Sequence, residues 1–195
     1  MSLSIINTSD GSHTLYNEKL NETYHSIHGA IQESEHIYIE SGIKYFIDNQ
    51  KKKNIQILEI GFGTGLNVIL TYKFSLSHTY TIHYNTIESN PLKMEMVNKL
   101  NYIDILGEKY KDVFALMHTQ KPDEVVSISS KLFFNKQILR LEEFKNKKKY
   151  DIIFFDAFAP SKQPEIWSAK NLLKIYDAME KGAILVTYCS SGKFK

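Results

Sequence analysis

The sequence predicts an α/β protein built on a mostly parallel sheet with helices on both faces. Two observations support this class. Apolar, strand-like runs alternate along the chain with helical segments, and one run, residues 150–155, has almost no polar side chain. A strand that is buried on both faces is typical of a parallel sheet. In such sheets ligands bind at the carboxyl ends of the strands.

The strands and helices are expected in a simple order. The first 35 residues are polar and rich in Asn, Ser, His and Tyr, which predicts a lead-in with little regular structure before a helix near residues 33–49. Helices are also expected near residues 64–75 and 164–180, with short helices and loops between residues 101 and 122. Apolar and β-branched runs predict strands at residues 55–60, 80–87, 124–128, 132–139, 150–155 and 183–189.

Local signals mark the ends of two of these helices. Asn90 and Pro91 have the residue types of an N-cap and first turn. Pro164 and Gly182 are expected to begin and end the helix near residues 164–180. The apolar positions of that helix predict one buried stripe, made of Ile166, Trp167, Leu172, Leu173, Tyr176 and Met179.

Length and composition limit the class of protein. The 195 residues suit one domain with one sizeable core, and no run approaches the roughly 20 apolar residues that span a bilayer. No signal peptide is evident, and the lone Cys189 excludes an internal disulfide and a cysteine-based zinc site. We therefore expect a cytoplasmic protein with no membrane segment and no metal. The net charge of +2 neither requires nor excludes nucleic acid, although lysines such as Lys162 could hold phosphates or simply be solvated.

A glycine loop follows the first predicted strand of the sheet. Gly61, Gly63 and Gly65 alternate where strand turns into helix, so the backbone can turn tightly and approach a ligand. A dinucleotide-binding loop would need another glycine at Leu66, and no Gly-Lys-Ser/Thr of a phosphate loop follows. An acidic residue followed by alternating glycines is instead the pattern of S-adenosylmethionine-dependent methyltransferases.

Polar residues near this loop are predicted to complete the cofactor site. Glu88 ends the next strand, where its carboxylate could accept both ribose hydroxyls; the alternative is a surface glutamate at the start of a loop. Glu59 is expected to support the loop or to bind the cofactor ammonium through water. Asn67, at the end of the motif, is included among the cofactor-binding residues.

The segment Asp-Ala-Phe-Ala-Pro, residues 156–160, follows the most apolar strand. Asp156 therefore leaves the sheet at its ligand-binding edge, where we expect it to orient an amine nucleophile and to help a proton leave. The alternative role for Asp156 is a turn or helix cap. Ala157 and Phe158 are predicted to contact the cofactor with Asp156, and Phe158 could stack on a flat ring.

With these motifs together, the sequence resembles the methyltransferase domain of the MnmC family, which modifies the wobble uridine of tRNA, and the stand-alone forms of that domain. The resemblance covers residues 21–195, and residues 150–167 are its most distinctive stretch because many methyltransferases share the glycine loop. The other matching stretches are residues 21–34, 58–67, 84–92 and 184–189.

The resemblance implies a Rossmann-like, class I S-adenosylmethionine-dependent methyltransferase. Its implied reaction converts 5-aminomethyl-2-thiouridine to 5-methylaminomethyl-2-thiouridine in tRNA. In fused family members a FAD-dependent oxidoreductase domain first exposes the amine, and this chain is too short to carry that domain. We therefore expect tRNA as a partner, with a separate FAD-dependent oxidoreductase or upstream wobble-uridine enzymes.

The resemblance also implies roles for residues outside the two motifs. Tyr24 and Glu33 match the family's lead-in, which would fold over the cofactor; ordinary packing and helix capping is the alternative. Phe158, Gln163 and Trp167 would line the approach of the flipped base, and Trp167 also fits the apolar stripe. Lys162 joins these three in the predicted substrate-binding set.

Two departures from the family pattern lead to further expectations. The family's adenine-facing Asp aligns near Arg140, which cannot accept the adenine amino hydrogen bond, so Glu142 or Glu143 would have to substitute or adenine would bind more weakly. The chain also stops before the family's final helix and strand pair. We expect the C-terminal strands to be missing and the strand at residues 183–189 to be an uncovered edge.

The resulting interpretation is one domain, residues 1–195. Residues 1–50 would cover the cofactor site and residues 51–195 would form the core, truncated at its C-terminus. Three alternatives stay open: a methyltransferase for another amine or RNA site, a non-catalytic module that holds the cofactor or tRNA, and a dehydrogenase that tolerates Leu66.

Overall fold

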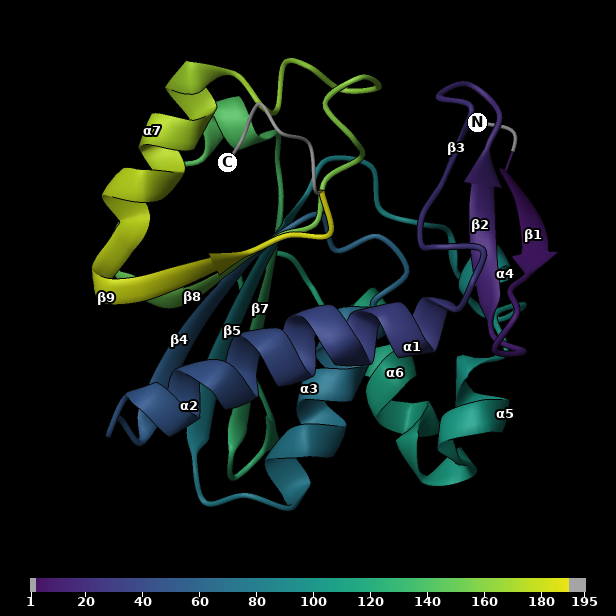
Figure 1. Ribbon diagram of the computed structural model, residues 1–195. Helices are drawn as coiled ribbons and strands as arrows, with labels where there is room; N and C mark the ends of the chain where they lie inside the picture. Colours follow the sequence, from purple (N-terminus) through teal and green to yellow (C-terminus); the bar gives the residue numbers. More distant parts are fainter. Residues whose placement is uncertain (1–2, 190–195) are drawn as a thin grey trace.

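The computed structural model describes residues 3–189, and its centre is a six-stranded sheet (Figure 1). The strand order is β6-β7-β5-β4-β8-β9, and β6 alone runs antiparallel to its neighbour. The predicted mostly parallel sheet is therefore confirmed. Its strands are β4 (Asn54–Ile60), β5 (Thr81–Glu88), β6 (Val126–Ser129), β7 (Leu132–Ile138), β8 (Tyr150–Phe155) and β9 (Met179–Val186).

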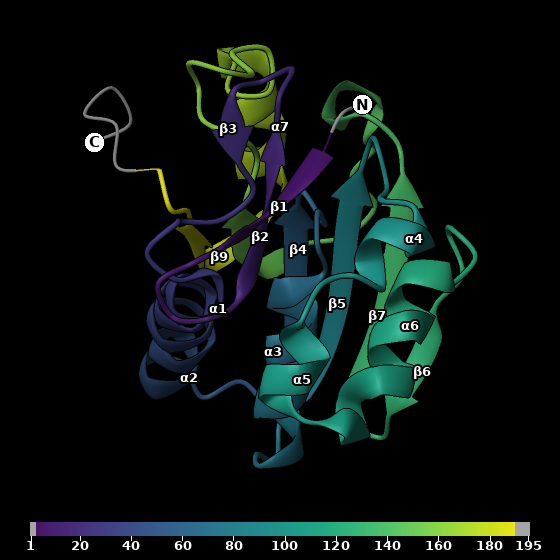
Figure 2. The same cartoon turned by 90° about the vertical axis from the view of Figure 1, so that its right-hand side faces the viewer.

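Helices cover both faces of this sheet, as predicted. Along one face runs a continuous helix formed by α1 (Ala30–Ser34), the π-helical η1 (Glu35–Lys44) and α2 (Tyr45–Asn49). The same side holds α3 (Leu66–Leu76), α4 (Met94–Val97), α5 (Tyr102–Leu106), the single turn η2 (Glu108–Tyr110) and α6 (Lys111–Thr119) (Figure 2). The other face is covered by η3 (Leu141–Glu143) and α7 (Ala169–Ala178).

Alternation along each central strand separates two apolar cores. Ile57 and Phe154 pack with the α1–α2 side, whereas Leu58 and Phe155 pack with the α7 side. This is the period-2 pattern of a sheet that is covered on both faces. Glu59 therefore projects to the same face as Ile57, beneath α3, and not toward α7.

The prediction of an irregular lead-in is wrong. The first residues form a three-stranded antiparallel sheet of β1 (Leu3–Asn7), β2 (His13–Asn17) and β3 (Glu22–Thr23). Its polar composition hid the burial of these strands, since the side chains of Thr14 and Asn17 are buried although polar. The small sheet stands beside the carboxyl ends of β4 and β5, next to the edge where ligands bind (Figure 2).

The turn between β1 and β2 caps the long helix. The Ser12 hydroxyl accepts hydrogen bonds from the Ala30 and Ile31 amides, at 3.2 and 3.3 Å, and the Asp10 carboxylate accepts one from the Gln32 amide at 3.0 Å. These amides have no partners inside the helix, so the hairpin satisfies them. The pKa of Asp10 is lowered to about 2. Burial by itself would raise this pKa, but the hydrogen bonds from Ser12, Gln32 and Thr8 together lower it by more. The N-terminal sheet and α1 are therefore one unit.

Two helix predictions need correction. Asn90 and Pro91 do not start a helix, because α4 begins later with Lys93 as its N-cap. The helix predicted near residues 164–180 is shorter, since the Ser168 hydroxyl caps α7 and Pro164 and Trp167 lie in the turns before it.

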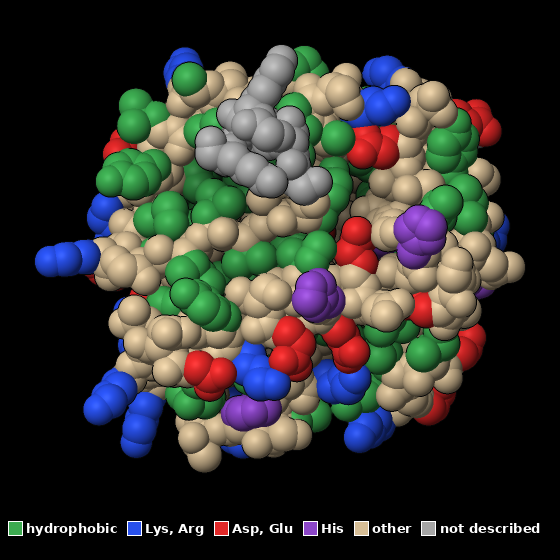
Figure 3. Space-filling view, in the orientation of Figure 1, with side chains coloured by type: hydrophobic (Ala, Val, Ile, Leu, Met, Phe, Trp, Pro, Cys, Tyr) green, Lys and Arg blue, Asp and Glu red, His purple; other side chains and the backbone are tan. Residues whose placement is uncertain are grey.

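The predicted apolar stripe of this helix is also only partly buried. Leu173 and Tyr176 are 60% and 71% exposed. Figure 3 shows hydrophobic side chains at the surface in the region of α7 and β9. Ile175 and Ala178 face the core instead. The last strand begins at Met179, directly after the helix, and not at Ala183.

β9 forms one edge of the sheet within residues 3–189, and it pairs on one side with β8. Residues 190–195 lie outside the described residues, so the prediction that the family's C-terminal strands are missing stays a prediction. No helix among the described residues has the length and apolar character that crossing a membrane requires.

Candidate active site

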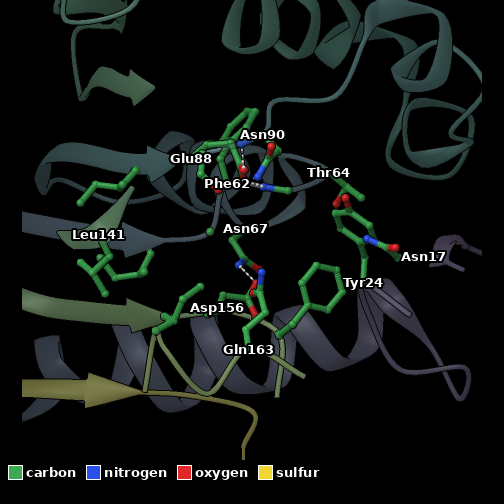
Figure 4. A pocket seen from close by; sticks show the side chains of 18 of the residues that line it. Asn17, Tyr24, Phe62, Thr64, Asn67, Glu88, Asn90, Leu141, Asp156 and Gln163 are labelled. Atoms are coloured by element: carbon green, nitrogen blue, oxygen red, sulfur yellow. Dashed lines mark hydrogen bonds between the residues drawn. The ribbon is translucent and has the colours of Figure 1, made fainter. Parts of the chain in front are cut away.

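A pocket opens at the carboxyl ends of β4, β5 and β8 (Figure 4). The glycine loop forms its floor, and Glu88 and Asp156 stand on opposite sides. The N-terminal segment closes another side with Tyr24. These parts come from distant stretches of sequence and meet because parallel strands place their carboxyl ends together.

The glycine loop ties three strand ends to one another. The Gly61 amide donates to the Ile87 carbonyl of β5, and the Asp156 amide after β8 donates to the Ile60 carbonyl, both at 2.9 Å. Gly61 has φ of +96°, and a β-carbon there would lie 2.5 Å from the Asp156 carbonyl oxygen. Only glycine satisfies both conditions. The same approach of the backbone that makes the pocket also prevents any side chain at this position.

Glu88 stands at the end of β5 with both carboxylate oxygens engaged. One oxygen accepts from the Gly63 amide at 2.9 Å and the other from the Asn90 amide at 2.7 Å. Glu88 lines the pocket, and each carboxylate oxygen can accept more than one hydrogen bond, so the group can still accept from hydroxyl donors. The ribose role of Glu88 stays a prediction, and these bonds orient the carboxylate for it.

Asp156 is partly buried, and two side chains from the helices on the α1–α3 face of the sheet bind its carboxylate. Its carboxylate accepts a 2.5 Å hydrogen bond from the Tyr38 hydroxyl of η1 and a 2.7 Å bond from the Asn67 amide of α3. Burial raises the pKa of Asp156 well above the ordinary carboxyl range; the hydrogen bonds from Tyr38 and Asn67 oppose this shift, and the charge of Glu33 adds to it.

Glu59 lies beneath Asn67 and does not line the pocket. It is 1% exposed and accepts a 3.1 Å bond from the same Asn67 amide nitrogen that binds Asp156. Burial raises the pKa of Glu59, the nearby Thr86 hydroxyl lowers it, and the charge of Asp156 raises it. Asn67 therefore bridges two carboxyl groups.

The segment that directly follows β3 contributes two aromatic side chains to the site. Tyr24 packs edge-on against Phe158, with ring centroids 4.9 Å apart, and its ring lies against the glycine loop, where a β-carbon at Gly63 would be 3.3 Å from it. His25 is buried and shares a 2.7 Å hydrogen bond with the Thr64 hydroxyl of the loop. Burial lowers the pKa of His25 to about 4, so the ring is neutral at physiological pH. His25 therefore tethers the N-terminal sheet to the loop.

A buried lysine supports the loop from below. Lys136 of β7 is 1% exposed, and its ammonium group donates to the Met117 and His118 carbonyls at the end of α6, at 2.9 and 2.6 Å. The same ammonium group lies 5.0 Å from the Phe62 ring centroid. The His118 ring in turn shares a 3.1 Å bond with the Thr64 carbonyl. A helix C-terminus and an aromatic ring thus compensate the buried charge.

The structure places most of the predicted site residues around this pocket. Those that line it are Gly61, Gly63, Asn67, Glu88, Tyr24, Asp156, Ala157, Phe158 and Gln163. Gly65, Glu59 and Glu33 lie behind the lining, where Glu33 accepts a bond from the Ser26 amide at 2.8 Å. Their roles stay predictions.

Two predicted substrate-binding residues lie outside the pocket. Trp167 is buried against Phe155 and donates to the Phe158 carbonyl at 2.8 Å, so it supports Phe158 from behind. Lys162 lines a neighbouring hollow and donates to the Asn21 carbonyl at 3.0 Å, which links the segment after β8 to the N-terminal sheet.

Arg140 and its acidic neighbours also line that hollow or face solvent. Glu142 binds the Arg140 and Asn171 side chains, and Glu143 accepts from the Arg140 amide. Leu139 and Leu141 line the pocket instead. The pocket is therefore apolar where the family's aspartate was expected to align, and neither glutamate lines it.

Some residues of this site carried no sequence signal. Tyr38 and Lys136 lie outside the matching stretches, and His25 lies in the stretch 21–34 but had no predicted role; each acts through a partner that is distant in sequence. Among residues 3–189 there is no group of three or more His, Cys, Asp or Glu side chains placed to hold a metal ion.

Comparison with known proteins identifies the relationship. Residues 102–195 match a family described as S-adenosyl-L-methionine-dependent methyltransferase. The tRNA 5-methylaminomethyl-2-thiouridine biosynthesis bifunctional protein MnmC of Leptospira interrogans is 31% identical over 188 residues, covering 90% of this chain and 28% of that protein. The chain is a relative of MnmC. The MnmC protein of Burkholderia multivorans is 24% identical to this chain, over 93% of this chain and 29% of that protein. The chain spans less than a third of these bifunctional MnmC proteins.

A solved structure agrees with the fold. MnmC2 from Aquifex aeolicus superposes with a TM-score of 0.77 and 27% identity, covering 97% of this chain and 60% of that one. This MnmC relative therefore has the class I S-adenosylmethionine-dependent methyltransferase fold, as predicted, and its cofactor is S-adenosylmethionine. The site fits that group, because Asp156 on the pocket wall and Glu59 behind it form no ion pair within residues 3–189, and such carboxyl groups suit a positively charged ligand.

Replacing Gly61 by alanine should test the loop geometry. Gly61→Ala combines a positive φ with a clash against backbone, whereas Gly11→Ala combines a similar φ of +82° with open space. We expect both to cost about 1–2 kcal/mol in strain, and Gly61→Ala to cost about 1–3 kcal/mol more. Urea unfolding measures the difference. Equal losses for the two variants would show that the approach to Asp156 is not tight.

Lys136→Met should test the buried support of the loop. The substitution leaves the Met117 and His118 carbonyls without a partner, so we expect a loss of about 1–3 kcal/mol in unfolding free energy and weaker S-adenosylmethionine binding by calorimetry. Lys99→Met, at an exposed lysine, serves as the control. Wild-type cofactor affinity in a folded Lys136→Met protein would contradict a supporting role.

Proposed function

We propose that this chain transfers the methyl group of S-adenosylmethionine to the aminomethyl nitrogen of 5-aminomethyl-2-thiouridine in tRNA, giving 5-methylaminomethyl-2-thiouridine. The observation that carries the proposal is Asp156, an oriented carboxylate on the pocket wall beside the Tyr24–Phe158 ring pair. The names of the relatives, MnmC and MnmC2, support tRNA as the acceptor.

The chemistry follows from what the acceptor amine needs. When bound, S-adenosylmethionine supplies an electrophilic methyl group on a sulfonium. A protonated amine has no lone pair, so the site must hold the neutral form and point its nitrogen at the methyl carbon. In this proposal Asp156 accepts a hydrogen bond from the amine N–H and then the proton that the methylated nitrogen loses. Its raised pKa suits an acceptor that works near neutral pH.

The rest of the pocket suits a flat base. Tyr24 and Phe158 offer aromatic surface beside the glycine loop, and Gln163 adds an amide with donor and acceptor atoms. The adjoining hollow contains Lys19, Arg140 and Lys162, which could contact the phosphates on either side of a flipped nucleotide. We expect the aminomethyl acceptor to come from an oxidoreductase reaction, with a FAD-dependent enzyme as the partner.

Methyl transfer to defined tRNA tests the proposal. The purified chain is incubated with S-adenosylmethionine and tRNA that carries 5-aminomethyl-2-thiouridine, and the nucleosides are analysed by mass spectrometry. We expect methylation of that nucleoside, a rate that falls as pH drops through the neutral range because Asp156 becomes protonated, and a loss of roughly 100-fold or more in Asp156→Asn. Asp104→Asn, at an exposed aspartate of α5, should keep the wild-type rate.

The other outcomes are informative. Methylation of polyamines in preference to tRNA would indicate a small-amine methyltransferase. Cofactor binding without transfer to either acceptor would indicate a non-catalytic module. Both results would overturn the proposed reaction, although each leaves the fold and the cofactor pocket as described.

A further inference from the structure

Glu59 and Asp156 are two carboxyl groups that share one hydrogen-bond donor. They lie on the adjacent strands β4 and β8, at or just past the carboxyl ends. Asn67 donates to Glu59 at 3.1 Å and to Asp156 at 2.7 Å, from the same amide nitrogen. A single neutral amide can orient both groups, but it does not cancel their charge.

Within residues 3–189, no Lys, Arg or His side chain forms an ion pair with either carboxyl group. The titratable groups that face Asp156 are Tyr38 of η1, Glu33 of α1 and Tyr188 after β9.

The surroundings of Glu59 are equally free of cations. Tyr84 and Thr86 of β5 face it, and neither can carry a positive charge. Two neighbouring carboxylates in a largely buried site repel strongly, and such pairs hold a proton that separate carboxylates would lose. Burial raises the pKa of both groups in the same direction.

We propose that Glu59 and Asp156 form a carboxyl pair that keeps one shared proton in the ligand-free protein and releases it when S-adenosylmethionine binds, so that the pair selects the sulfonium cofactor over S-adenosylhomocysteine. The inference rests on the cofactor of the proposed function and not on its tRNA acceptor. S-adenosylmethionine carries one more positive charge than its demethylated product. That charge would balance the doubly ionised pair, which has no ion-pair partner among the described residues.

The proton and charge balance closes over one turnover. On cofactor binding the shared proton goes to solvent, and the pair becomes doubly ionised beside the sulfonium. In methyl transfer the carbon–sulfur bond breaks, its electron pair stays on sulfur, and the amine lone pair forms the new carbon–nitrogen bond. The positive charge is then on nitrogen, which gives its proton to Asp156. The pair thus holds one proton again when only the neutral thioether is present.

Calorimetry in two buffers tests this exchange. S-adenosylmethionine and S-adenosylhomocysteine are titrated separately into the protein at neutral pH, in phosphate and in Tris, whose ionisation enthalpies differ. We expect the apparent enthalpy for S-adenosylmethionine to differ between buffers by an amount that corresponds to release of up to about one proton per site. For S-adenosylhomocysteine the two buffers should give the same value.

Glu59→Gln is the matched variant, because glutamine has the shape of the protonated acid and cannot release a proton. We expect it to abolish the proton release and to lower the preference for S-adenosylmethionine over S-adenosylhomocysteine by about tenfold. Glu143→Gln changes a carboxyl group that binds the Arg140 amide outside the pocket, and it should behave as wild type.

A wild-type measurement keeps the test independent of that variant's folding. The ratio of the two affinities should rise with pH through the neutral range, by at most about tenfold per pH unit, and then level off. S-adenosylmethionine binding without proton release, equal release for both ligands, or an affinity ratio independent of pH would each overturn the inference. These results would leave methyl transfer to tRNA untouched, and absent transfer would leave the proton exchange untouched.

Discussion

The close contact between Gly61 and the backbone of Asp156 is the constraint on which the site depends. Through it the ends of β4 and β8 lie closer than any side chain at position 61 would permit, and the Gly61 amide brings in the end of β5. Three strand ends then form one rigid platform. Glu88, Asn67 and Asp156 take their places from that platform, because each lies within a few residues of a strand end or of the loop.

Buried polar side chains hold the glycine loop of this platform from two sides. Lys136 and His118 fix the loop from the α6 side, and His25 fixes it from the N-terminal sheet. These contacts are buried and polar, so they define one geometry where an apolar core would allow several. The N-terminal sheet is therefore a part of the site, since the loop, the long helix and Tyr24 all depend on it.

Electrostatics gives the pocket its chemical character. The pocket combines apolar lining at Leu139 and Leu141, an oriented carboxylate at Glu88 and the carboxyl pair of Glu59 and Asp156, which forms no ion pair within residues 3–189. These features suit the apolar, hydroxyl-bearing and cationic parts of a sulfonium nucleoside. In the proposed reaction the positive charge moves from sulfur to nitrogen, and Asp156 would lie near both atoms.

The sequence by itself determined the parallel sheet, the glycine loop and the carboxylates at the strand ends, because these depend on local patterns: apolar runs, alternating glycines, and polar residues directly after a strand. It did not determine the N-terminal strands, the start of α7 or the exposure of Leu173 and Tyr176, since short polar strands and helix ends are decided by what packs against them. Tyr38, His25 and Lys136 became visible only in the tertiary structure. Their partners lie many residues away along the chain, and a hydrogen bond of that kind leaves no periodicity or spacing in the sequence.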